Sequence, residues 1–175
     1  NEYIESVWYI LKQVYTKDLL YKGLTIQPFS PAAGTGLSTH ELNQPGAYRD
    51  VTDTTAVACF EIKDTFIDKV NTLFNSKLDK AYIIAWTTTP WTLPSNTALC
   101  VGPKIEYCLV NTFNPYTKET QSVILAKALI SKWFQPENEK PTDATLEFNE
   151  KNLPYQILGT ALGADLQGME YLQLL

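Results

Sequence analysis

Residues 82–97 read YIIAWTTTPWTLPSNT and carry the strongest structural signal in the chain. The almost wholly apolar stretch Tyr82–Thr87 predicts a short strand, and its lack of polar alternation favours a central place in a sheet. Pro90 and Pro94 follow, and proline cannot donate a hydrogen bond to a neighbouring strand. The strand is therefore expected to end at the threonines, in a turn that the prolines stiffen.

The three successive threonines place hydroxyl groups at the end of that strand. Because strand residues alternate between faces, Thr87 and Thr89 are expected to share one face and Thr88 to lie on the other. Such hydroxyls can position a substrate or a water molecule, but they cannot act as a general base near neutral pH. With the indoles of Trp86 and Trp91 beside them, they suit a small polar ligand with a flat group. Thr is also common in strands, so composition alone favours a structural edge with the tryptophans packed in the core.

The flanking sequence predicts many short strands and a few helices, which favours a mixed fold built on a twisted or barrel-like sheet. Helices are predicted at 3–20, 66–78 and 127–134; strands at 56–62, 97–101, 106–111, 121–125, 145–148 and 155–158; short extended pieces at 24–27 and 48–51; and a polar loop at 135–143. The helix at 3–20 has an apolar stripe that needs a partner surface.

Composition narrows the possible functions. The chain has 175 residues, of which 45% are hydrophobic and 19% charged, which indicates a globular chain with one domain or one domain and an appendage. No apolar run approaches a membrane span, and we expect no membrane partner and no secretory signal. The net charge is −5 and Arg49 is the single arginine, so the chain alone is expected to bind nucleic acid weakly. Its three cysteines, none spaced as C-x-x-C, predict buried, reduced thiols in a cytosolic protein.

The run Trp86–Asn96 resembles the threonine-rich signature of the editing domain of isoleucyl-tRNA synthetases. Related valyl and leucyl enzymes carry a Thr-Thr-Arg-Pro type of run there, whereas this chain has Thr-Thr-Thr-Pro-Trp, which favours the isoleucyl branch. Other segments resemble the same family in the same order, with 112–157 the least matched: 5–23, 27–30 with 34–41, 48–53 and, more weakly, 158–159 with 166–171.

The resemblance implies a mixed α/β (α+β) fold, with a β-barrel-like editing domain of the valyl/isoleucyl/leucyl type and flanking helices. Residues 1–47 would be a lead-in helix and a turn-rich segment from the edge of the catalytic core. Residues 48–175 would be the editing domain, truncated at its C-terminus, because the family's later Gly-Thr-Gly-x-Val-His run and its Asp find no match. The motifs of the synthetic site are missing as well, so the chain looks like a fragment of a larger, cytoplasmic synthetase.

The resemblance also implies a function. The parent enzyme would join Ile to its tRNA using ATP with Mg, and a missing methylene gives only about 1–3 kcal/mol of discrimination against Val. The editing domain would restore fidelity by hydrolysing mischarged Val-tRNA. Partners would therefore be tRNA, bound through the full-length enzyme, and the rest of the synthetase chain.

The implied editing pocket maps onto the threonine-rich run. Thr87, Thr88 and Thr89 would line it, Trp91 would form a wall, and Asn96 would hold the turn or contact the ligand. No complete catalytic set is expected in this chain, because the family's acidic group for the substrate ammonium would lie beyond residue 175.

No metal or other cofactor is expected for the chain itself. Some family members carry a Cys-x-x-Cys zinc pair in an early turn, where this chain has Ser30 and Ala33, and neither can be a thiolate ligand.

A non-catalytic, β-rich ligand-binding module remains the main alternative. Exposed Trp86 and Trp91 forming an aromatic platform for a sugar or peptide would favour that module, whereas a pocket ringed by threonine hydroxyls would favour editing. A hydrolase with a threonine nucleophile is disfavoured, because no Lys or His lies near the run to act as its base.

Overall fold

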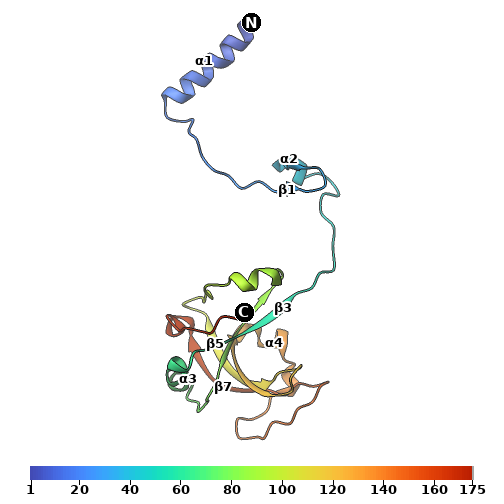
Figure 1. The fold of residues 1–175 in the computed structure, drawn as a ribbon, viewed down its shortest axis with the longest axis vertical. Coiled ribbons are helices and arrows are strands. Elements are labelled where there is room, and N and C mark those ends of the chain that lie inside the picture. Colours follow the sequence, from blue (N-terminus) through green and yellow to red (C-terminus); the bar gives the residue numbers. More distant parts are fainter. Residues whose placement is uncertain (175) are drawn as a thin grey trace. The chain divides into compact units, whose positions relative to one another are not determined.

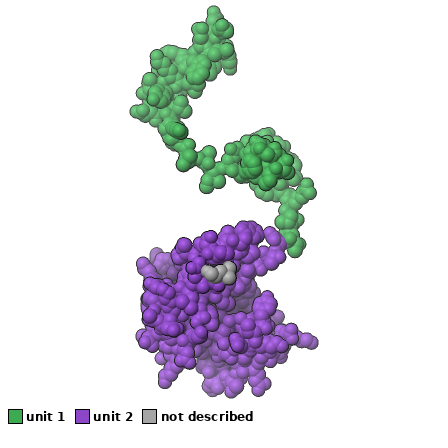
Figure 2. All heavy atoms as spheres, in the orientation of Figure 1, with its two compact units in different colours: residues 1–52 green, residues 53–175 purple. Residues whose placement is uncertain are grey.

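The computed structural model describes residues 1–174, which fall into two compact units. Contacts divide the chain into Asn1–Thr52 and Asp53–Leu175 (Figure 2). The candidate site lies in the second unit. None of the helices within residues 1–174 has the length and apolar character needed to cross a bilayer.

The first unit opens with α1 (Glu2–Thr16), which confirms the predicted helix with a shorter C-terminal end. Glu2 and Glu5 lie in its first turn, where their negative charges stabilise the helix by interacting with the positive end of the helix dipole. The helix ends before residue 20 because Asp18 adopts a φ of 54°, which no helical residue can have. No residue of α1 is buried, so its apolar stripe stays exposed.

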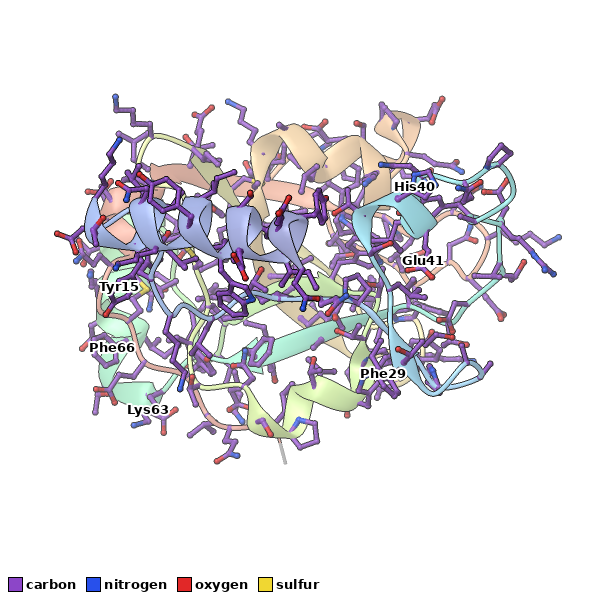
Figure 3. All side chains as sticks on the ribbon, turned by 90° about the horizontal axis from the view of Figure 1, so that it is seen from above. Tyr15, Phe29, His40, Glu41, Lys63 and Phe66 are labelled. Atoms are coloured by element: carbon purple, nitrogen blue, oxygen red, sulfur yellow. The ribbon has the colours of Figure 1, made fainter. Side chains whose placement is uncertain are left out.

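A small hairpin and a one-turn helix complete this unit. Strands β1 (Phe29–Ser30) and β2 (Thr35–Gly36) pair antiparallel, and α2 (Thr39–Leu42) follows. Ser38 and Glu41 form a capping box, with the Ser38 backbone N–H donating to the Glu41 carboxylate at 2.7 Å. Figure 3 shows His40 and Glu41 on α2. The predicted extended pieces at 24–27 and 48–51 form no strand.

The second unit is built on a five-stranded sheet with the order β3-β4-β6-β5-β7 (Figure 1). Its strands are β3 (Ala56–Glu61), β4 (Tyr82–Thr87), β5 (Glu106–Phe113), β6 (Thr120–Ala126) and β7 (Gln156–Leu162). All pairs are antiparallel except β4 with β6. The mixed α/β class is therefore confirmed. The sheet of the described residues is open, with β3 and β7 at its edges, and it does not close into a barrel.

Both faces of the sheet are covered, because β5 sends alternate side chains into two hydrophobic clusters. Leu109 packs with Val70 and Phe74 of α3 (Ile67–Phe74) in one cluster. Cys108 and Val110 pack with a second group on the other face, which includes Phe134 and Tyr155. These buried side chains hold β4 and β6, the strands that border the candidate site.

The remaining elements are short helical segments of three to six residues. They are η1 (Asp64–Phe66), η2 (Pro90–Ser95), η3 (Lys127–Leu129), α4 (Ile130–Trp133), η4 (Pro136–Asn138) and η5 (Gly163–Leu166). The helix predicted at 66–78 is η1 with α3 and stops at Asn75, whose φ is 51°. The helix predicted at 127–134 is η3 followed by α4.

Two predicted strands are wrong. Residues 97–101 follow η2 without pairing, and their apolar side chains Leu99 and Val101 face a cavity instead. Residues 145–148 also stay outside the sheet, and Phe148 packs edge-on against Phe113 with ring centroids 5.7 Å apart. In both cases a side chain finds an apolar contact without its backbone joining a strand.

Candidate functional site

Three threonine hydroxyls meet where β4 ends and η2 begins. The hydroxyl oxygens of Thr87 and Thr89 lie 3.3 Å apart, and those of Thr89 and Thr92 lie 3.3 Å apart as well. The backbone N–H of Thr89 donates to the Thr87 hydroxyl at 3.0 Å, and the Thr92 hydroxyl donates to the Thr89 carbonyl at 2.7 Å. We call Thr87, Thr89 and Thr92 the hydroxyl cluster.

The geometry confirms that Thr87 and Thr89 lie on one side of the chain. Thr92 was missed by the sequence analysis, although η2 brings a residue three positions after Thr89 back beside it. Thr88 is exposed and its hydroxyl is outside the cluster. The three threonines predicted as one site are therefore divided, with Thr87 and Thr89 in the cluster and Thr88 outside it.

The two indoles beside the cluster face solvent to a large extent. Trp86 is 53% exposed and Trp91 is 68% exposed. Taken alone, such exposure favours an aromatic platform for a ligand over a pocket ringed by hydroxyls. Trp86 also lines a cavity, however, so its indole is part of a concave surface.

Asn96 holds the turn. Its side-chain N–H donates to the Ala98 carbonyl at 3.2 Å, and its backbone N–H donates to the Leu93 carbonyl at 3.0 Å. The remaining side-chain acceptor takes a hydrogen bond from the Tyr171 hydroxyl. These contacts favour the turn-holding role over direct contact with a ligand.

The segment around Tyr171 fastens this loop to the sheet. The Tyr171 ring packs edge-on against Phe60 of β3, with ring centroids 5.0 Å apart. The Leu172 N–H donates to the Glu61 carbonyl at 2.7 Å, and the Gln173 side chain donates to the Pro94 carbonyl at 3.3 Å. Residues far apart in sequence therefore fix the position of η2.

A cavity of about 480 Å³ lies between β4 and β6, and Trp86, the residue before Thr87, lines it. These parallel strands pair only at Tyr82 with Val123 and at Ile83 with Ile124. Beyond those pairs, residues of both strands line the cavity, and Trp86 is among them. Thr87, Thr88, Thr89, Trp91 and Asn96 do not line it.

The hydroxyl cluster is uncharged. Within residues 1–174, no hydrogen bond or ion pair joins a charged side chain to Thr87, Thr88 or Thr89. Hydroxyls in this arrangement can orient a water molecule or donate to a developing oxyanion, but the proton of an attacking water must go elsewhere.

The cysteines take no part in the cluster. Cys108 is fully buried, and burial raises the pKa of its thiol to about 11. Cys59 is partly buried, which also raises the pKa of its thiol, whereas Cys100 is exposed. The prediction of buried thiols is therefore right for Cys108 and wrong for Cys100.

The sequence was compared with family models and with known proteins. No family model matches the chain. It is 58% identical over 178 residues to the isoleucine–tRNA ligase of Cytophaga hutchinsonii and 56% identical over 178 residues to that of Bacteroides thetaiotaomicron, and each match covers the whole chain. The sequence is that of an isoleucine–tRNA ligase segment. The isoleucine–tRNA ligase of Porphyromonas gingivalis is 54% identical over 176 residues. The segment spans about 15% of the length of these ligases.

The ligase segment shows how the early turn is held without thiolates. Ser30 ends β1 and Ala33 lies in the turn that follows, where the Ala33 N–H donates to the Ser30 hydroxyl at 3.3 Å. The Gly34 N–H donates to the Ser30 carbonyl at 2.8 Å, and Gly34 supplies the positive φ of 67° that the turn requires. In the described part of the chain, no three His, Cys, Asp or Glu side chains gather as metal ligands would.

We expect the purified ligase segment to contain no structural zinc after washing with a chelator. The turn at Ser30 is closed by hydrogen bonds of its own, so metal removal should leave its conformation unchanged. Elemental analysis would measure the zinc content, and one zinc per chain would contradict the expectation. A Ser30→Cys, Ala33→Cys double variant, analysed alongside, shows whether restoring the thiolates is enough to bind the metal.

Proposed function

We propose that this segment belongs to the editing domain of an isoleucine–tRNA ligase, where it helps to hydrolyse Val-tRNA formed in error. Residues 48–175 would belong to that domain, and residues 1–47 would lead in from the catalytic core. The observation that carries the proposal is the hydroxyl cluster at the end of β4 in a chain so similar to these ligases.

The cluster suits hydrolysis of an ester that is already activated. An aminoacyl ester needs an oriented water and stabilisation of the oxyanion rather than a strong nucleophile from the protein. Thr87 and Thr89 would orient the ester and the water, and Thr88 would contact the substrate from the other side of the strand end. Trp91 would bound the site, and Asn96 would hold η2 in place.

The wider role follows from the ligase relatives. We propose that the complete enzyme joins Ile to its tRNA with ATP and Mg, in the cytoplasm, and that the rest of the ligase chain provides the synthetic site. The tRNA would be bound mainly by that remainder, because this segment has an acidic net charge of −5 and one arginine.

The exposed indoles support a second candidate, a ligand-binding module without catalysis. Trp86 and Trp91 present apolar rings to solvent, as an aromatic binding platform does. The two candidates differ in what the hydroxyls do. A test on a full-length ligase that carries this segment separates them, because removing the hydroxyls should abolish Val-tRNA hydrolysis only if the site is an editing site.

We expect the isolated 175-residue chain to hydrolyse Val-tRNA at less than about 1% of the full-length rate, since one missing electrostatic partner costs about 100-fold or more. The substrate ammonium needs a carboxylate partner in a site that excludes water, and none is bonded to the hydroxyl cluster here. A deacylation assay on purified mischarged tRNA measures this rate. Full-rate hydrolysis by the isolated chain would show that the cluster needs no such partner.

A further inference from the structure

Residues 170–173 connect the threonine-rich loop to the sheet from a distant part of the sequence. Tyr171 forms an antiparallel bridge with Ile62, next to the end of β3 (Figure 1). The Lys63 N–H donates to the Glu170 carbonyl at 3.0 Å, and the Lys63 ammonium pairs with the Glu170 carboxylate at 2.6 Å. This pairing holds the backbone of Tyr171 against the sheet.

The Tyr171 side chain has an apolar ring and a polar tip that contact different elements. Its ring packs against Phe60 of β3, which is 1% exposed. Its hydroxyl donates to the side-chain oxygen of Asn96, the residue that caps the C-terminal end of η2. A tyrosine has few side-chain torsions, so a ring held on the sheet also holds its hydroxyl. Tyr171 is therefore a rigid connection between β3 and η2.

Asn96 passes this connection on to η2. Its side-chain oxygen accepts from Tyr171 while its side-chain N–H donates to the Ala98 carbonyl at 3.2 Å, so both ends of the amide are held. Its backbone N–H donates to the Leu93 carbonyl at 3.0 Å and closes the last turn of η2. The Tyr171 hydroxyl thus acts on the end of η2 through one amide group.

Burial in the core does not hold η2. None of its residues is buried, and Pro90 and Pro94 have no backbone N–H to donate. Within residues 1–174, the side-chain hydrogen bonds that reach η2 or its cap from a distant segment come from Tyr171 and Gln173. Thr92 of the hydroxyl cluster lies in the middle of η2, so a shift of η2 would move a member of the cluster.

We propose that Tyr171 is a positioning residue for the ester hydrolysis assigned to the hydroxyl cluster. Its hydroxyl holds Asn96, Asn96 closes η2, and η2 keeps Thr92 in the cluster. The role is indirect, because the hydroxyl is bonded to Asn96 and not to a threonine of the cluster. Groups that orient a reacting water must be held to within about 0.5 Å, which an unburied loop needs outside contacts to achieve. The inference rests on the editing function proposed above.

The test uses Tyr171→Phe in a full-length ligase that carries this segment, because the change removes one oxygen and keeps the ring against Phe60. We expect kcat for Val-tRNA hydrolysis to fall about 2- to 10-fold, the range for one lost hydrogen bond. KM should stay unchanged, because the tRNA would be bound mainly by the rest of the ligase. Ile-tRNA formation should keep its rate, which also shows that the variant is folded.

Tyr155→Phe is the matched control. The Tyr155 ring is 2% exposed and its hydroxyl donates to the Glu139 carboxylate at 3.2 Å, so this variant loses a similar bond that does not involve η2. We expect its kcat for Val-tRNA hydrolysis to be unchanged. If the Tyr171 hydroxyl only stabilised the fold, the two variants would behave alike, and that result would overturn the inference.

A double-mutant cycle tests the route through Asn96. Tyr171→Phe combined with Asn96→Ala should hydrolyse Val-tRNA at the rate of Asn96→Ala alone, because the hydroxyl acts through the amide that Asn96→Ala removes. Losses that multiply in the double variant, or an unchanged kcat in Tyr171→Phe, would contradict the positioning role.

The variant with Thr87, Thr88 and Thr89 all replaced by Ala separates this inference from the editing proposal. If the threonine variant loses hydrolysis and Tyr171→Phe keeps it, the positioning role alone is wrong. If both variants keep full hydrolysis, the editing proposal is wrong and the positioning role falls with it.

Discussion

Replacing Thr87, Thr88 and Thr89 together with Ala in a full-length ligase that carries this segment is expected to slow Val-tRNA hydrolysis by about 100-fold or more. Thr87 and Thr89 form two of the three members of the hydroxyl cluster, so the triple change removes the groups that would orient the ester and the water. Formation of Ile-tRNA should stay near its normal rate, because the proposal assigns the synthetic site to the rest of the ligase chain. The enzyme should therefore release Val-tRNA.

The measurement is a deacylation assay on purified mischarged tRNA, run beside an assay of Ile-tRNA formation. The double variant Ser95→Ala, Thr97→Ala is a matched control, since it removes two exposed hydroxyls from the same loop outside the cluster. Unimpaired editing by the triple variant would show that the threonines are a structural strand end. It would then favour the ligand-binding module over the editing site.

Gly159→Ala is expected to lower the free energy of unfolding by about 2–4 kcal/mol. Gly159 lies in β7 where α3 crosses it, and a Cβ there would lie 2.4 Å from the Phe74 carbonyl oxygen. Because the clashing atom belongs to the backbone, the helix end and the strand must separate. This contact closes the buried cluster around Phe74, so the loss should spread to the whole second unit.

Urea unfolding of the chain, followed by circular dichroism, measures this change. Gly23→Ala is the matched control, because its new Cβ would meet only the Tyr21 side chain, at 3.4 Å. A Gly159→Ala chain as stable as the control would show that α3 and β7 can separate without cost.

The sequence predicted the strands of the sheet more reliably than it predicted the site. Tyr82–Thr87 was predicted with its observed bounds, because a short apolar run followed by threonines and prolines predicts a strand and also marks where the strand ends. Residues 97–101 have a similar apolar composition but are not a strand, since their side chains face the cavity. Hydrophobicity signals burial, and it does not say whether the backbone finds a partner strand.

The site shows the same limit. The alternation rule placed Thr87 and Thr89 on one side, but Thr92 joins them only because η2 turns the chain back. The contact of Tyr171 with Asn96 and the position of Lys132 beside Trp86 are tertiary contacts, for which no local pattern exists. The capping box at Ser38 and Glu41, in contrast, has a recognisable spacing and could have been predicted.

The bond between Tyr171 and Asn96 has a consequence for how the protein is made. The two residues are 75 positions apart, so a ribosome that adds roughly 5–20 residues per second completes Asn96 about 4–15 s before Tyr171. During that interval the threonine-rich loop exists without the residues that fasten it to β3. The loop is therefore synthesised early and takes its final position late, and a slow step in translation between the two residues would prolong its exposure.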